Sequence, residues 1–225
     1  MHIGLIGGIG PAATDHYYRS LIARHVALGP PLDLTIVHAD ARDLVANLAA
    51  GAADRQAALF LPLVERLEAA GARAAAVTSM AGHFCVSQLE ARSPLPIINV
   101  LPALDAALAA RGFKTVGVIG TRTVMESRIY GRIGAAALVI PEGGLRDQVH
   151  DAYVAMAVAG RVTEAQRAVF VAAGRALCER QGAEAVILGG TDLFLAFEGR
   201  DDAGFETIDA VAVHVAAIHR HAAGG

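Results

Sequence analysis

Short apolar runs alternate with longer amphipathic stretches along the chain, and this pattern predicts strands that alternate with helices. The first run, HIGLIGG at 2–8, ends in glycine, and the stretch at 11–28 that follows has Pro11 at its start, as helices often do. Further strands are predicted at 34–40, 74–79, 96–100, 115–121, 136–140 and 185–190, and further helices at 41–50, 54–70, 103–110, 123–134, 165–181 and 207–223. Such alternation predicts the α/β class, with parallel sheets that helices cover on both faces.

The second half of the chain repeats the first. Placing residue 2 on residue 115 aligns HIGLIGG with TVGVIGT, so that Gly4 matches Gly117 and Gly7 matches Gly120. Placing residue 71 on residue 182 aligns GARAAAVTS with GAEAVILGG, and an amphipathic helix precedes each copy. The offsets of 113 and 111 residues agree closely. A duplicated α/β unit explains this agreement, and chance similarity between glycine-ended strands is the alternative.

The repeat indicates where a ligand would bind. Ligands of parallel sheets bind beyond the carboxyl ends of the strands. The alignment places Ser79 and Gly190 at matching strand ends, and likewise Gly8 and Thr121. We therefore expect two pseudo-symmetric, three-layer domains with the active site in the cleft between them. A site of this kind suits a planar intermediate that is approached from both faces.

Composition narrows the class of partner. Hydrophobic residues make up 54% of the 225 residues and aromatic residues only 5%, so small and branched aliphatic side chains supply the core. The net charge is −3 and the basic residues are scattered, which disfavours nucleic acid and membrane surfaces as partners. No apolar run reaches the roughly 18 residues of a membrane span, and the start lacks the pattern of a signal peptide. We expect a cytoplasmic protein that binds a small solute.

The two cysteines and the single lysine restrict the chemistry. Cys85 and Cys178 lie far apart in apolar surroundings and are interpreted as reduced core residues. Lys114 is the only lysine and lies beside a predicted strand start, which makes a pyridoxal phosphate site an unfavoured interpretation. No cofactor and no metal are therefore expected.

Polar residues follow the predicted strands at 2–8 and 74–79. The stretch GLIGGIGPAAT places a glycine-rich turn at a helix start, where free N–H groups can hold a carboxylate or phosphate. It lacks the helix-packing glycine of a dinucleotide fingerprint, and Pro11 intervenes. Thr14 and Tyr18 lie one helical turn apart and either face the cleft or cap and pack. In VTSMAGHF, Ser79 is a poor base without a neighbour, and His83 either transfers protons, at an ordinary pKa of about 6.5, or is structural.

The second half offers hydroxyls and one carboxylate. In GTRTVMES, Thr121 and Thr123 stand at a predicted helix start and suit anion binding, although Thr123 is also an ordinary N-cap. In VILGGTDLFL, the glycines at 189 and 190 permit close approach, and N–H groups at this turn suit an enolate or carboxylate oxyanion. Asp192 is a general base, an orienting carboxylate or a helix-start cap.

Taken together, these blocks resemble the aspartate/glutamate racemase superfamily along nearly the whole chain. The blocks are GLIGGIGPAATDHYY, the AD at 39–40, LEAAGA, SMAGH, VGVIGTRTVMESRIY, VIPE, AEAVILGGTDL and TIDAVAVHVAAIH, of which GTRTVMES and AVILGGTDL are the most specific. The resemblance implies a cofactor-independent, often dimeric enzyme of two pseudo-symmetric α/β domains. It places the first domain at 1–100 with 207–225 and the second at 101–206.

The chain departs from this family at its catalytic positions. Family racemases use two cysteines, one per domain, in motifs that resemble C-N-T-x-H and G-C-T-E. Here the first falls on Ser79 in SMAGH and the second on Gly190 in GGTD, so neither thiol is present. Cys85 does not replace the first thiol, because it lies beyond the matched histidine. The missing thiols argue against two-thiol racemisation of aspartate or glutamate.

The sequence therefore predicts an atypical racemase-type isomerase that forms an enolate-like intermediate on a small carboxylic or dicarboxylic acid, in a homodimer. Predicted catalytic residues are Ser79 and Thr191, which bind carboxylate oxygens, and His83 or Asp192, which transfers the proton. Predicted substrate-binding residues are Ile9, Gly10, Thr14, Asn47, Met80, Ala81, Thr121, Thr123 and Gly190. A one-base lyase, decarboxylase or cyclase on the same scaffold and a non-catalytic carboxylate-binding protein are the alternatives.

Overall fold

A computed structural model describes residues 1–28, 31–200 and 202–224. The chain divides into two compact units, Met1–Val100 with His214–Gly225, and Leu101–Val213. Each unit is built around its own parallel sheet, as the alternation of apolar runs and amphipathic stretches predicts. None of the helices described is long and apolar enough to cross a bilayer.

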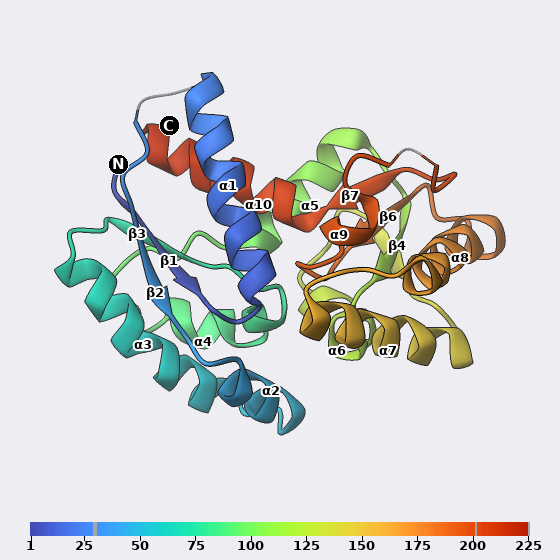
Figure 1. Cartoon of the computed structure of the whole chain (residues 1–225), viewed down its shortest axis with the longest axis horizontal. Helices are drawn as coiled ribbons and strands as arrows, with labels where there is room; N and C mark the ends of the chain where they lie inside the picture. Colours follow the sequence, from blue (N-terminus) through green and yellow to red (C-terminus); the bar gives the residue numbers. More distant parts are fainter. Residues whose placement is uncertain (29–30, 201, 225) are drawn as a thin grey trace. The chain divides into compact units, whose positions relative to one another are not determined.

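The first unit contains a three-stranded parallel sheet. β1 (Ile3–Gly7) lies between β2 (Leu34–His38) and β3 (Ala74–Val77). Every residue of β1 and β3 is buried, because α3 (Ala53–Ala69) covers one face of the sheet and α1 (Pro11–Leu28) and α10 (Ala210–Ala223) cover the other (Figure 1). The central strands are therefore apolar on both faces, as strands of covered parallel sheets are.

The rest of the first unit departs from the predicted elements at 81–90, where no helix was predicted, and at 96–100. α2 (Ala41–Ala49), a 3-10 helix at Ala81–Cys85 and α4 (Val86–Glu90) are present. The predicted strand at 96–100 is wrong: only an isolated bridge joins Ala75 to Ile97, and α5 (Val100–Arg111) begins directly afterwards. Pro96 cannot donate a backbone hydrogen bond, and the early start of α5 leaves no residues for a longer ladder.

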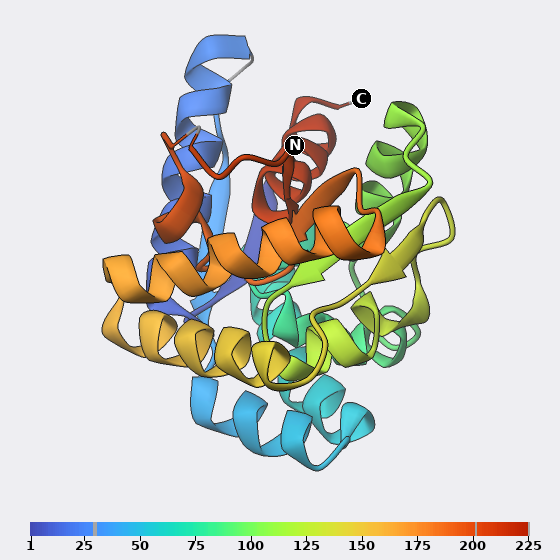
Figure 2. The same ribbon diagram turned by 90° about the vertical axis from the view of Figure 1, so that its right-hand side faces the viewer.

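The second unit contains a four-stranded parallel sheet in the order β5-β4-β6-β7. Its strands are β4 (Thr115–Ile119), β5 (Ala137–Val139), β6 (Ala185–Leu188) and β7 (Thr207–Asp209). Figure 2 shows α7 (Gly144–Ala159) and α8 (Glu164–Gln181) in front of this sheet. The predicted helix at 207–223 in fact begins at Ala210, because residues 207–209 extend the sheet as β7.

The predicted helix at 123–134 is shorter than expected. α6 (Arg122–Glu126) is followed by a 3-10 helix at Ile129–Gly131. Arg128, Ile129 and Tyr130 all have positive φ values, so the right-handed helix cannot continue through them.

The predicted repeat is visible in how the two sheets pack. The order β2-β1-β3 corresponds to β5-β4-β6. A Cβ placed on Gly4 would lie 2.7 Å from Leu67 Cδ1 of α3, and one placed on Gly117 would lie 2.8 Å from Leu177 Cδ1 of α8. Both glycines let a leucine of the covering helix approach the central strand. The two units are therefore versions of one α/β design.

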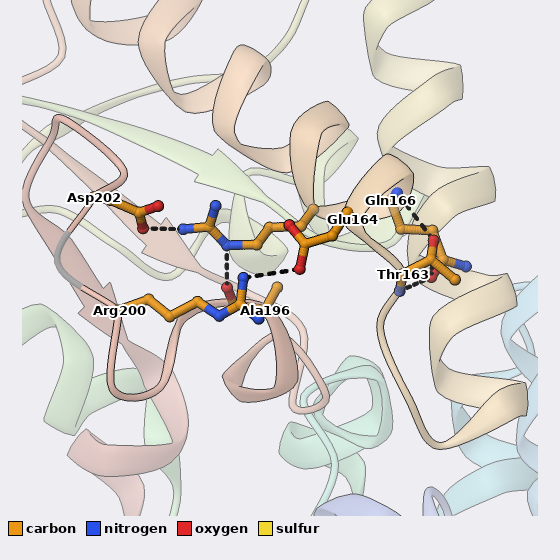
Figure 3. Close-up of polar contacts among 7 residues, drawn as sticks. Thr163, Glu164, Gln166, Ala196, Arg200 and Asp202 are labelled. Atoms are coloured by element: carbon orange, nitrogen blue, oxygen red, sulfur yellow. Dashed lines mark hydrogen bonds and ion pairs between the residues drawn. The ribbon is translucent and has the colours of Figure 1, made fainter.

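The segment after β6 is anchored to α8, as Figure 3 shows. Arg167 of α8 is buried, and its Nε donates to the carbonyl of Ala196 in α9 (Phe194–Phe197) at 3.0 Å, while its guanidinium pairs with Asp202. Arg200 pairs with Glu164 at 3.1 Å nearby. These contacts hold the end of the loop that begins at the carboxyl end of β6.

Candidate active site

Threonine hydroxyls tie together the loops at the carboxyl ends of β1 and β3. Thr14 Oγ1 accepts from the Gly8 N–H at 3.0 Å, donates to the Gly10 carbonyl at 3.1 Å and lies 3.2 Å from Thr78 Oγ1. The Thr78 hydroxyl donates to the carbonyl of Ile6. Thr14 therefore holds the glycine-rich loop in place.

A pocket of about 370 Å³ lies beside this loop in the first unit, between the start of α1 and the end of β2. Its lining includes Gly8, Thr14, Tyr18 and His38. The His38 ring covers Gly8, where a Cβ would lie 2.3 Å from the histidine Nδ1. Thr14 and Tyr18, one turn apart on α1, thus line the same pocket.

Ser79 and His83 form a second polar pair in the first unit. Ser79 is buried, and its Oγ accepts from the Gly82 N–H at 3.2 Å. His83 Nδ1 lies 2.7 Å from the Ser79 carbonyl, so Nδ1 carries the proton and Nε2 presents a lone pair. Among the residues that the structure describes, none hydrogen-bonds to this buried Nε2.

The His83 ring is directed to the interior of the first unit. It packs edge-on against His214 of α10, with 5.4 Å between ring centroids. His214 Nε2 donates to the Ile98 carbonyl at 2.7 Å, and the Tyr17 hydroxyl donates to its Nδ1 at 2.9 Å. Burial lowers the pKa of His83 to about 4 and that of His214 to about 3. The ordinary pKa assumed from the sequence does not hold, and both rings are neutral at neutral pH.

The other predicted residues of the first unit have varied surroundings. Asn47 is buried, and its side-chain amide donates to Gln56 Oε1 at 2.9 Å, which joins α2 to α3. Ile9 and Met80 are buried, and Gly10 and Ala81 are half-buried.

Cys85 provides no reactive thiol in place of the missing one. Its Sγ donates to the Gly82 carbonyl at 3.3 Å. Burial raises the pKa of the Cys85 thiol to about 12, so the thiolate does not form at neutral pH. The two cysteines are free, with Cys85 buried and Cys178 half-buried.

In the second unit, Thr121 and not Thr123 is the N-cap of α6. The Thr121 Oγ1 accepts from the Val124 N–H at 3.3 Å, and the helix begins at Arg122. The capping role suggested for Thr123 is therefore wrong, because Thr123 already lies within the first turn. Thr123 is half-buried there.

A buried carboxylate cluster follows β6. The Tyr153 hydroxyl of α7 donates to Asp192 Oδ2 at 3.0 Å, and Thr191 Oγ1 lies 3.5 Å from the same oxygen. The three residues are 7%, 3% and 5% exposed respectively, so this charge is largely removed from water. Burial, reinforced by the charge of Asp192, raises the pKa of Tyr153 above its usual range, so its hydroxyl remains a donor.

The helix-cap role suggested for Asp192 is wrong, because its carboxylate bonds to Tyr153 and α9 has no side-chain cap. Gly189 also differs from expectation, since its N–H donates to the Ile119 carbonyl at 2.8 Å and is not available to an oxyanion. No sequence pattern marked Tyr153, which lies 39 residues before Asp192 on another helix.

The structure therefore brings predicted residues together in three places: Thr14 with Gly10, Ser79 with His83, and Thr191 with Asp192. Within residues 1–28, 31–200 and 202–224, no group of three or more histidine, cysteine or acidic side chains could hold a metal ion. The predicted cleft stays a prediction.

Two parallel α/β units with polar groups after their strands define a duplicated α/β protein of the kind that binds small ligands at strand ends. The family model of the Asp/Glu/hydantoin racemases matches residues 6–218, so the chain belongs to this family. The resemblance found in the sequence is thereby confirmed.

Solved structures agree with this assignment. A candidate Asp/Glu racemase of Yersinia pestis is 26% identical, with a TM-score of 0.82 over 99% of each chain. An aspartate racemase homologue from Pyrococcus horikoshii is 22% identical, with a TM-score of 0.79 over 98% of each chain. Picrophilus torridus aspartate racemase is 18% identical, with a TM-score of 0.77 over 99% of this chain and 94% of its own. The predicted fold class, with two parallel-sheet α/β units, is confirmed.

Proposed function

We propose that this protein moves a proton at the α-carbon of a small carboxylic or dicarboxylic acid, through an enolate-like intermediate and without a cofactor. Asp192 is the proton-transfer group. The observation that carries this proposal is a buried carboxylate, held by Tyr153 at the carboxyl end of β6, beside a residue 190 that has no side chain.

The family assignment supports the substrate class. The Asp/Glu/hydantoin racemases act on small amino-acid carboxylates and their relatives, at a carbon beside a carbonyl group. Removal of a proton from such a carbon leaves an enolate, which hydrogen-bond donors in a site of low dielectric stabilise. Of the proposed carboxylate binders, Ser79 and Thr191 carry hydroxyls, and both are buried.

Asp192 suits the proton transfer better than His83 does. An ordinary carboxyl group, with a pKa of about 4, is in its basic form at neutral pH, and the Tyr153 donor favours that form at Asp192. A general base typically contributes about 10²–10⁴-fold to a rate. His83 Nε2 also has a lone pair, but its ring packs against His214 and its Nδ1 binds the Ser79 backbone. These contacts favour a packing role for the His83 ring over proton transfer.

One base implies a particular stereochemical course. Asp192 takes the Cα proton, the electron pair passes into the carboxylate as an enolate, and the same carboxyl group returns a proton to the same face. This course exchanges the proton without inverting the carbon. It also suits a lyase, decarboxylase or cyclase, each of which needs only one proton-transfer group at this carbon.

Deuterium wash-in tests the proposal. The protein is incubated with aspartate, glutamate and related small acids in heavy water, and the Cα proton is followed by NMR. We expect exchange with retained configuration. Inversion would indicate racemisation by a second group, and binding without exchange would indicate a non-catalytic carboxylate-binding protein.

Two variants and a control identify the base. Asp192→Asn should lower the exchange rate about 100-fold or more, whereas His83→Asn, which keeps a donor for the Ser79 carbonyl, should change it only a few fold. Asp151→Asn, at an exposed position on the helix that carries Tyr153, is the matched control. Equal exchange in Asp192→Asn and in the unaltered protein would remove Asp192 from this role.

A further inference from the structure

Gly190 has a steric reason to be glycine. Its backbone does not require one, since Gly190 is not among the glycines with positive φ in the described chain. A Cβ at this position would instead lie 2.2 Å from Cε2, 2.7 Å from Cζ and 2.9 Å from Cδ2 of Tyr153. The tyrosine ring therefore occupies the place where a side chain of residue 190 would begin.

The Tyr153 ring cannot turn aside without loss. It is 7% exposed and belongs to the hydrophobic core of the second unit, where closely packed neighbours restrict it. Its hydroxyl donates to Asp192 Oδ2 at 3.0 Å. The ring is thus fixed by packing along its length and by a hydrogen bond at its end.

The matching strand end in the first unit lacks this arrangement. Ser79, which the repeat aligns with Gly190, has a side chain whose Oγ accepts from the Gly82 N–H. The closed position is therefore a property of the second unit and not of the duplicated scaffold.

We propose that Tyr153 is a positioning residue that closes position 190 to any side chain and holds the Asp192 carboxylate for proton transfer. The role in holding Asp192 for proton transfer rests on the proposed function, whereas the closing of position 190 does not. Because of Tyr153, the loop after β6 presents the carboxylate of Asp192 and has no side chain at residue 190.

A stability cycle tests the closed position without any activity measurement. Gly190→Ala should lower the melting temperature by roughly 2 to 12 °C, as overpacked cores do. The loss should persist with Tyr153→Phe, which keeps the ring, and should shrink to within about 2 °C with Tyr153→Leu, which removes the Cε2 and Cζ atoms. Each double variant is compared with its own Tyr153 single variant.

Gly134→Ala is the control for this cycle. Gly134 also lies in the second unit, and a Cβ there would meet nothing within 4 Å, so little change is expected. An equal loss from Gly190→Ala in the Leu and Phe backgrounds would overturn the steric half of the proposal.

The pH profile of the exchange rate tests whether Tyr153 positions the Asp192 carboxylate. Tyr153→Phe keeps the ring but removes the donor that favours the ionised carboxylate, so Asp192 should be protonated at higher pH. The acid limb of the exchange rate should move up by about one pH unit, and the rate on the plateau should fall roughly 10-fold. A merely structural tyrosine would lower the melting temperature but leave this limb in place.

The outcomes are distinguishable. Suppose that the unaltered protein exchanges the Cα proton and that Tyr153→Phe has the same pH profile of the exchange rate. This result would overturn the positioning role alone. Absence of exchange in the unaltered protein would overturn the proposed function together with that role. The stability cycle would still decide whether Tyr153 closes position 190.

Discussion

The loops that follow β3 and β6 occupy matching places in the repeat but carry different polar groups. In the first unit, small hydroxyls hold the loops and a neutral His83 lies beneath them. In the second unit, two glycines replace the hydroxyls, and a buried Asp192 is held by Tyr153. A duplicated backbone therefore does not keep its two strand ends alike, because different helices pack against them: His214 of α10 contacts His83 in the first unit, and Tyr153 of α7 contacts Asp192 in the second.

The centres of the sheets, in contrast, stay alike. Gly4 meets Leu67 and Gly117 meets Leu177 at nearly the same distances. A covering helix can approach the central strand only where a side chain is missing, so this pair is constrained in both units. At the strand ends the constraint differs between the units, since Ser79 has a side chain whereas a Cβ at Gly190 would meet the Tyr153 ring.

The largest expected effect comes from truncating the leucine that packs against the central strand of either sheet. Leu67→Ala and Leu177→Ala should each lower the free energy of unfolding by about 2 to 5 kcal/mol, because both leucines are fully buried. Chemical denaturation measures the loss, and hydrogen exchange locates it in the unit concerned. Leu59→Ala, at an exposed position of α3, is the control and should cost far less. A large effect in one unit only would show that the two centres are not equivalent.

The second expected effect is a loss of stability of the first unit in acid. His83 has a pKa of about 4 when folded and about 6.5 when unfolded, so the unfolded state binds more protons between these values. Stability is therefore retained above pH 6.5 and falls as the pH falls toward 4.

Between pH 6.5 and 5 this term amounts to about 2 kcal/mol for one histidine. Denaturation at several pH values should show that His83→Asn removes about this much of the loss. The buried histidines of the described chain all belong to the first unit, so hydrogen exchange should show the loss there. If His83→Asn showed the same pH dependence as the unaltered protein, His83 would not be the cause of the loss. A His214→Asn variant would then test His214, whose pKa is lower still.

A third expected effect is local to the hydroxyls of the first unit. Thr14→Val keeps the shape of the side chain but leaves the Gly8 N–H without its acceptor, at a cost of about 1 to 2 kcal/mol. Hydrogen exchange of the Gly8 amide should accelerate. Thr123→Val in the second unit is the matched control, and a similar loss there would show that Thr14 has no special role.

The smallest expected effect concerns the covering helices. α8 begins with a capping box in which Thr163 and Gln166 bond reciprocally, whereas Ala52 gives α3 no side-chain cap. Thr163→Ala should cost about 1 kcal/mol in thermal denaturation. Arg200→Ala, which breaks only an exposed pair with Glu164, should cost about 0.5 kcal/mol or less. A larger loss from Arg200→Ala would reverse this ranking.

Much of the fold follows from local pattern. Strands such as β1 and β3 are continuous apolar runs that end at turns, and helices such as α3 have apolar residues at helical spacing. The failures lie where local signals are weak. Residues 207–209 look like the start of a helix and form a strand only because β6 offers a free edge, and residues 96–100 look like a strand but make one bridge.

The candidate site could be predicted only in part. Strand-end residues such as Ser79 and Asp192 follow from the rule that parallel sheets bind ligands at their carboxyl ends. Tyr153 could not be found in this way, because nothing in its own helix distinguishes it from a core residue. The lowered pKa of His83 could not be predicted either, since it comes from burial, and one of the buried contacts is with His214, far along the chain.

By itself, the sequence determined the α/β class, the duplication, the family and the absence of thiols at residues 79 and 190, because these depend on residue identity and on periodicity along the chain. Only the tertiary structure decided that the Tyr153 ring occupies the place of a side chain at residue 190 and that Asp192 is buried beside it. Side chains from distant helices fill the space and set the electrostatics at a strand end, and their approach depends on packing that no local pattern encodes.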